Sequence, residues 1–99
     1  MNKLTCKISK TEETLMLIVD LTPLDALEMV EVITSLMGLF RSVVGTKIKQ
    51  FDNEIVEDCV EKKKFFYVIR RDKTEGYEKE EISSRKILAE NSIKIVDLH

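Results

Sequence analysis

Carboxylates close to lysines are the side chains of this chain that come nearest to a catalytic pattern. The only histidine is the last residue, His99, so the usual proton-transfer group near neutral pH is absent from the body of the chain. A D…E-x-K spacing, as in metal-dependent nucleases, is formed by Asp52 or Asp58, Glu61, Lys62 and Lys63. In such sites the acids hold a divalent cation and the lysine helps to activate water. Here the triplet falls at the end of a predicted helix rather than on a strand, and such triplets arise by chance in a chain rich in glutamate and lysine. The sequence therefore predicts no enzyme, no metal site and no cofactor.

A basic segment with consecutive aromatic residues, residues 62–73, offers a different chemistry. Its basic side chains are Lys62, Lys63, Lys64, Arg70, Arg71 and Lys73, and they bracket the rings at positions 65–67. Positive charge beside stackable rings is typical of nucleic-acid binding. Acidic runs at residues 52–61 and 75–81 flank the segment, and the overall net charge is -2. We expect these acids to neutralise the basic residues in an ion-pair network, and nucleic-acid binding is the alternative.

The two cysteines, Cys6 and Cys59, are too far apart in the sequence for a C-x-x-C motif. With His99 as the one further soft ligand they cannot close a structural zinc site. Free cysteine packs as a small apolar residue, so buried thiols are expected, with a disulfide as the alternative.

The strongest structural pattern is a helix predicted between Thr22 and Gly45. Thr22 supplies an N-cap hydroxyl, Pro23 suits the first helical position, and Gly45 is a natural stop. Apolar residues recur at spacings of three and four along it, at Ala26, Met29, Val30, Ile33, Leu36, Met37, Phe40, Val43 and Val44. This spacing predicts an apolar stripe that packs against a sheet.

The remaining elements are predicted from apolar alternation and periodicity. Strands are expected at residues 4–9 and 14–21, paired as a hairpin, and at residues 46–51, 64–71 and 92–98. Strand 64–71 is expected at the centre of the sheet. One helix is expected after Asp52 or Asn53, with an apolar stripe made of Ile55, Val56, Cys59 and Val60. A further helix is expected at residues 79–91, around Ile82, Arg85, Leu88 and Ala89. The order is ββαβαβαβ. The fold class is α+β, a single-domain two-layer sandwich over residues 1–99, with helices on a mixed or antiparallel sheet.

Apolar residues outside the main stripe suggest self-association. Leu24, Val32 and Leu39 extend the apolar surface of the long helix, and contiguous apolar surface usually marks association. We therefore expect a homodimer whose interface includes these residues. No signal peptide or membrane-spanning segment is recognisable, because charged residues interrupt each apolar stretch, so an intracellular location is expected.

Length and composition together resemble a group of viral proteins. The chain has 99 residues, 43% hydrophobic and 34% charged, with a bias toward lysine, glutamate and isoleucine. In this it resembles the small uncharacterised accessory proteins of filamentous viruses that infect hyperthermophilic archaea. The resemblance implies a thermostable accessory or regulatory protein in the host cytoplasm. The sequence thus favours a non-enzymatic macromolecular interaction module, a homodimer that also contacts an unidentified protein. Nucleic-acid binding through residues 62–73 is its alternative.

Overall fold

The fold is a four-stranded mixed sheet with three helices. A computed structural model describes residues 3–44, 53–71 and 76–98. In chain order the elements are β1 (Thr5–Lys10), β2 (Thr14–Asp20), α1 (Ala26–Val44), α2 (Asn53–Lys62), β3 (Lys64–Arg70), α3 (Glu78–Glu90) and β4 (Lys94–Leu98). The strand order is β3-β2-β1-β4; β4 pairs parallel to β1, and the other two pairings are antiparallel. The predicted α+β class is confirmed.

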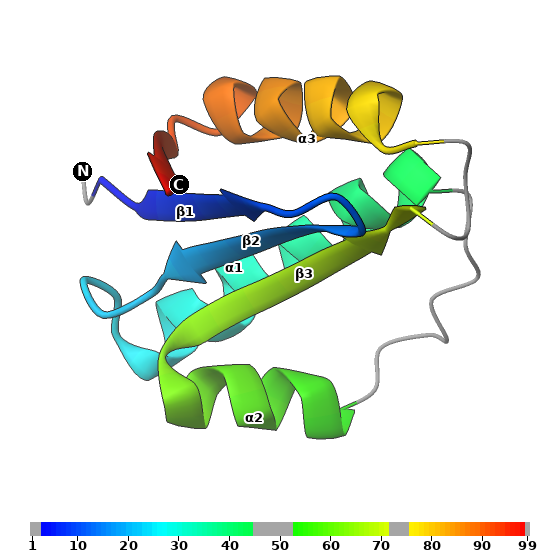
Figure 1. Ribbon diagram of the computed structural model, residues 1–99. Coiled ribbons are helices and arrows are strands. Elements are labelled where there is room, and N and C mark those ends of the chain that lie inside the picture. The colour runs from blue at the N-terminus through cyan, green and yellow to red at the C-terminus, as the bar shows by residue number, and fades with distance from the viewer. Residues whose placement is uncertain (1–2, 45–52, 72–75, 99) are drawn as a thin grey trace.

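All three helices lie on one side of the sheet (Figure 1), with α1 behind the strands and α2 and α3 at its flanks. Alternation along the strands sets the two faces, since successive side chains of a strand point in opposite directions. In β2, for example, Leu15, Leu17 and Val19 are buried beneath the helices. No described element covers the other face, so the fold is the predicted two-layer sandwich.

The first two predicted strands form the expected hairpin. Ile8 of β1 pairs with Leu17 of β2, which places both side chains in the core. In the connecting turn, the Thr11 hydroxyl oxygen accepts the backbone N–H of Thr14 at 3.0 Å. The hydroxyl therefore takes the place of the backbone carbonyl that accepts the hydrogen bond in an ordinary turn.

The start of α1 differs from the predicted one, because Asp25 rather than Thr22 caps the helix. The Asp25 carboxylate accepts the backbone N–H of Glu28 at 2.8 Å, and the Glu28 carboxylate accepts the N–H of Asp25 at 3.0 Å. This reciprocal pair is a capping box, which satisfies two helix-end donors together. The backbone N–H of Thr22 instead donates to Asp20 at 3.0 Å, and the hydrogen bonds from Thr22 hold the pKa of Asp20 below its usual value. The helix therefore begins one turn later than expected.

Replacing Asp25 with alanine is expected to lower the free energy of unfolding by about 0.5 to 2 kcal/mol, the usual range for losing an N-cap. Thr22→Ala is the matched control and should cost less, because it leaves the backbone bond from Thr22 to Asp20 in place. Urea denaturation followed by circular dichroism measures both. An equal or larger loss for Thr22→Ala would contradict the cap assignment.

The core side of α1 follows the predicted stripe for most of its length. Ile33 and Phe40 are 0% and 1% exposed, and Met37 is also buried. The Phe40 ring lies 4.8 Å from the ring of Tyr67 between centroids, and the Tyr67 hydroxyl donates to the Phe40 carbonyl at 3.2 Å. Burial raises the pKa of Tyr67 to about 12. Aromatic packing and one partly buried hydrogen bond thus attach the helix to β3.

Several expectations about single residues are wrong. Ala26 and Val30 of the predicted stripe are exposed, since they lie on the side of α1 turned away from the sheet. Ile82 and Ala89 of α3 and Ile55 of α2 are exposed for the same reason, whereas Leu88 and Cys59 are buried. The predicted strand at 46–51, the stop at Gly45, a cap at Asp52 and the side chains of Val43 and Val44 lie outside the described residues.

The position of β3 also differs from the prediction. β3 is an edge strand that pairs only with β2 among the described strands, whereas the sequence suggested a central position. The run of aromatic and β-branched residues is the reason for that expectation. In the structure Phe65 and Ile69 are buried, but Phe66 and Val68 on the opposite face are 41% and 46% exposed.

Candidate functional site

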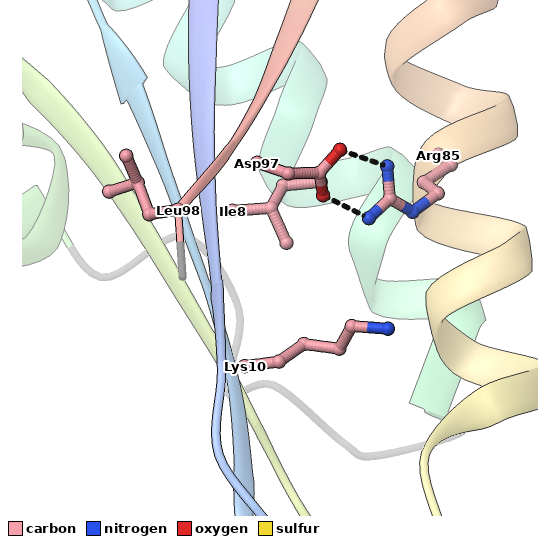
Figure 2. Close-up of a pocket in the computed structure, with 5 residues that line it drawn as sticks. All are labelled: Ile8, Lys10, Arg85, Asp97 and Leu98. Carbon is pink, nitrogen blue, oxygen red and sulfur yellow. Dashed lines mark hydrogen bonds and ion pairs between the residues drawn. The ribbon is translucent and has the colours of Figure 1, made fainter.

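The side of the sheet turned away from the helices is the candidate site, and we call it the open sheet face. Its side chains alternate with those of the core: Thr5, Lys7 and Ser9 from β1, Thr14, Met16, Ile18 and Asp20 from β2, Lys64, Phe66, Val68 and Arg70 from β3, and Lys94, Val96 and Leu98 from β4. Figure 2 shows the sheet close to edge-on, with Leu98 directed to this face while Lys10 and Asp97 point toward α3.

Strand register gathers apolar side chains on one half of the open sheet face. Phe66 pairs with Ile18, and Val68 pairs with Met16, so two neighbouring cross-strand pairs form an apolar quartet on β2 and β3. Directly opposed side chains are in contact range on a sheet. On the far side of β1, Val96 and Leu98 are aligned with Lys7 and Ser9. The quartet is therefore continuous, whereas the apolar residues of β4 are set apart by polar ones.

Basic side chains surround the apolar quartet. Lys64 and Arg70 stand at the two ends of β3, Lys7 lies beyond Ile18, and Lys94 is at the start of β4. Among the described residues, none of these four forms an ion pair. Asp20 is the single acidic residue that the described strands place on this face. The open sheet face therefore carries net positive charge although the whole chain carries -2.

Acidic side chains gather in the helical layer instead. On the described helices they are Glu28, Glu31, Glu54, Glu57, Asp58, Glu61, Glu78, Glu80, Glu81 and Glu90. The charge blocks seen along the sequence are thus sorted between the two layers of the fold. The expected ion pairs between the basic segment and the flanking acidic runs occur once among the described residues, where Lys62 pairs with Asp58 at 3.1 Å.

The structure separates the six predicted nucleic-acid-binding residues. Lys64 and Arg70 lie together on the open sheet face. Lys62 belongs to the end of α2, where its ammonium lies 6.0 Å from the ring centroid of Phe66. Lys63 occupies the turn with φ 56°, and Arg71 donates to the Glu12 carbonyl at 3.3 Å. Lys73 lies outside the described residues.

The three predicted interface residues belong to the helical layer. Leu24 and Val32 are partly buried against the core and line a shallow groove of about 760 Å³ with Leu4 and Ile93. Leu39 is partly buried and does not line that groove. Leu27 of α1, which the sequence did not single out, is more exposed, at 70%. Self-association through this part of the protein stays a prediction.

A chain of ion pairs joins α3 to the sheet (Figure 2). Glu81 contacts Lys10 of β1 at 3.0 Å and Arg85 at 2.9 Å, and Arg85 also pairs with Asp97 of β4. Burial by itself raises the pKa of Glu81, but the hydrogen bonds and charges of Lys10 and Arg85 outweigh it, so the pKa lies below the usual value. A cavity of about 440 Å³ borders Lys10, Arg85 and Asp97. Because these charges already satisfy one another, the cluster fastens α3 to the sheet.

The nuclease-like residues do not assemble into a site within the described part of the chain. Asp58 is paired with Lys62, and Glu61 and Lys63 are exposed around the end of α2; Asp52 lies outside the described residues. No three potential metal ligands among histidine, cysteine, aspartate and glutamate come together in the described ranges. Cys6 and Cys59 are both buried and unpaired, as expected for apolar packing, and burial raises the pKa of Cys6 to about 11.

Two further findings concern membrane-spanning helices and similarity to known proteins. Within residues 3–44, 53–71 and 76–98, no helix combines the length and apolar character needed to cross a bilayer. Comparison of the chain with protein-family models, with curated proteins and with solved structures gives no match. The function must therefore be argued from the geometry of the open sheet face.

Proposed function

We propose that this protein is a non-enzymatic interaction module and that the open sheet face is its contact surface. The observation that carries the proposal is the apolar quartet, in which Phe66, Val68 and Met16 are exposed and Ile18 is half-buried. A strand with one solvated face normally alternates apolar and polar residues. β2 instead carries apolar residues on both faces, which is the pattern of a strand covered on both sides.

The chemical character of the face supports binding rather than reaction. The quartet is aliphatic and aromatic; the residues around it are lysine, arginine, serine, threonine and Asp20, and Val96 and Leu98 lie apart on β4. An apolar centre with a polar rim is the usual anatomy of a macromolecular interface. An intracellular accessory or regulatory role, with the homodimer contact on α1, is part of the same proposal.

Nucleic-acid binding is the second candidate, supported by the placement of Lys64, Phe66 and Arg70 on one face of β3. A positively charged sheet surface with an exposed ring can hold a single strand through phosphates and base stacking. This candidate uses the same surface as the first, so a single mapping experiment addresses both.

Titration followed by amide NMR tests whether the open sheet face binds macromolecules. The probes are an acidic amphipathic helical peptide, a single-stranded DNA of about 12 nucleotides, and the protein itself over a concentration series. At least one probe should shift the signals of Met16, Phe66 and Val68. The Val68→Thr variant keeps the side-chain shape but adds a hydroxyl, so it should weaken that binding.

The matched control is Ile55→Thr, because Ile55 is similarly exposed, at 42% against 46% for Val68, but lies on α2 in the helical layer. This substitution should leave the shifts unchanged. If none of the three probes shifts signals of the open sheet face, the interaction proposal is wrong.

A further inference from the structure

We infer that the partner of the open sheet face is an amphipathic helix of another protein, with an apolar stripe flanked by acidic side chains. The inference rests on the proposed function and names the occupant of that same surface. Three observations support it: the size of the apolar quartet, the charges around the quartet, and the poor fit of a second copy or of a nucleic acid to this face.

The dimensions of the face suit one helix on its β2–β3 half. Neighbouring strands are about 4.8 Å apart, so four strands span roughly 15 to 20 Å, and a helix with its side chains is about 10 Å wide. One helix therefore covers about two strands. The apolar quartet lies on β2 and β3, and a helix aligned along these strands would cover both cross-strand pairs. It would also complete a third layer, as helices do on both faces of covered sheets.

The charges determine the flanks of that helix. Lys64 and Arg70 continue the column of Phe66 and Val68 on β3 beyond the two ends of the quartet, and Lys7 stands on the other side beyond Ile18. No described carboxylate lies within 4.0 Å of these three basic groups, although Lys64 pairs across the strands with Asp20 and both Lys64 and Lys7 act electrostatically on that carboxylate. Acidic side chains on both borders of the apolar stripe would meet them. Such complementary charge accelerates association and rejects partners of the wrong sign.

A second copy of this chain fits the face poorly. Stacking two open sheet faces about a two-fold axis parallel to the strands places Lys64 over Lys94, because both stand in the same cross-strand row. A two-fold axis perpendicular to the strands places Lys64 of one copy over Arg70 of the other, because these residues stand at opposite ends of β3. Both full overlaps bring basic groups together, and like charges brought together at an interface are costly.

A single-stranded nucleic acid would find charge but little to stack on. Phe66 is the one aromatic side chain that the described strands place on this face, and the rest of the quartet is Ile18, Val68 and Met16. Aliphatic side chains offer no stacking platform for bases, whereas they suit the apolar stripe of a helix. The Lys62 ammonium also lies over the Phe66 ring. The apolar surface therefore favours a protein.

The test measures fluorescence anisotropy of a labelled helical peptide of about 18 residues, with leucine along one face and glutamate on both flanks, titrated with the full chain. A peptide with lysine in place of glutamate is the matched probe. We expect the acidic peptide to bind and the basic one to fail. The affinity should fall as salt rises to about 150 mM and beyond, because exposed charge pairs are screened.

Charge-reversing variants locate the contact. Arg70→Glu and, separately, Lys64→Glu should weaken binding of the acidic peptide about tenfold or more, as like charges then face each other. Lys86→Glu is the control, since Lys86 is an exposed base on α3 in the helical layer. Both test positions are exposed on β3, and circular dichroism verifies that each variant is folded.

The outcomes separate the inference from the function on which it rests. If the acidic peptide does not bind while the single-stranded DNA or a second copy shifts the open sheet face, the partner named here is wrong and the interaction module stands. Equal binding of the acidic and basic peptides overturns the charge argument. If no probe binds, both proposals fail.

Discussion

Replacing Ile33 with alanine is expected to lower the free energy of unfolding by about 2 to 5 kcal/mol, the usual cost of truncating a fully buried aliphatic side chain. Ile33 is 0% exposed and lies in the middle of α1, within the core between this helix and the sheet. The loss combines the transfer free energy of the removed methyl and methylene groups with the cavity they leave. Urea denaturation monitored by circular dichroism measures it.

Leu27→Ala is the matched control on the same helix. Leu27 is 70% exposed, so its truncation removes little buried area, and alanine is a good helix former. We expect a change within about 0.5 kcal/mol. If Ile33→Ala were no more destabilising than Leu27→Ala, the orientation of α1 on the sheet would have to be different.

The second large effect is expected from Arg85→Ala, at about 1.5 to 3 kcal/mol, the range for hydrogen bonds to charged groups. Arg85 bonds Glu81 within α3 and Asp97 on β4, so its removal takes away the link between the last strand and the helix. It also leaves the buried Glu81 with one cationic partner, Lys10. Chemical denaturation near neutral pH gives the loss.

Lys86→Ala is the control for Arg85→Ala. Lys86 is the neighbouring residue on α3, its side chain is 75% exposed, and its nearest acidic atom, on Glu90, is 4.0 Å away. Exposed pairs of this kind contribute little, so we expect a change below about 0.5 kcal/mol. A similar loss for the two variants would show that helix propensity, rather than the link to Asp97, explains the effect.

The loss of stability in Arg85→Ala should depend on pH, because Glu81 must be ionised to pair with Arg85. Its pKa is lowered in the folded state, so its contribution is present above the pKa of an unfolded glutamate, about 4.3. That contribution is lost as pH falls through the folded-state pKa. The difference in stability between wild type and Arg85→Ala should therefore shrink below about pH 4. A difference that stays constant or grows on acidification would contradict the ionic role of Glu81.

Local patterns were sufficient for most of the elements. Weak alternation of apolar residues predicts β1, a β-branched and aliphatic run predicts β2, spacings of three and four predict the buried side of α1, and the aromatic and β-branched run predicts β3. These patterns work because each depends on the geometry of one element, with a period of two for strands and of 3.6 for helices. The error at the start of α1 is also local: Thr22 and Asp25 each have an acid three residues later, and it is Asp25 with Glu28 that forms the reciprocal cap.

The candidate site was predicted only in part. Their charge identifies Lys64 and Arg70 in the sequence, whereas the strand prediction gives Met16, Ile18 and Val68 no special role. A signal was present, because β2 is apolar at nearly every position, and such a run indicates cover on both faces. This apolar run does not by itself identify a binding surface, since a central strand that the same chain covers with helices on both faces has the same pattern.

The amino-acid sequence by itself determined the α+β class, the hairpin, the core side of α1 and the absence of a recognisable catalytic motif, because these depend on residue type and on spacing along the chain. Tertiary structure alone decided that β3 is at the edge and that the basic residues of the strands and the acidic residues of the helices separate into two layers. It also decided that no described element covers the open sheet face. Strand neighbours and layer cover are relations between distant segments, and periodicity within a segment does not identify which segments lie beside it or over it.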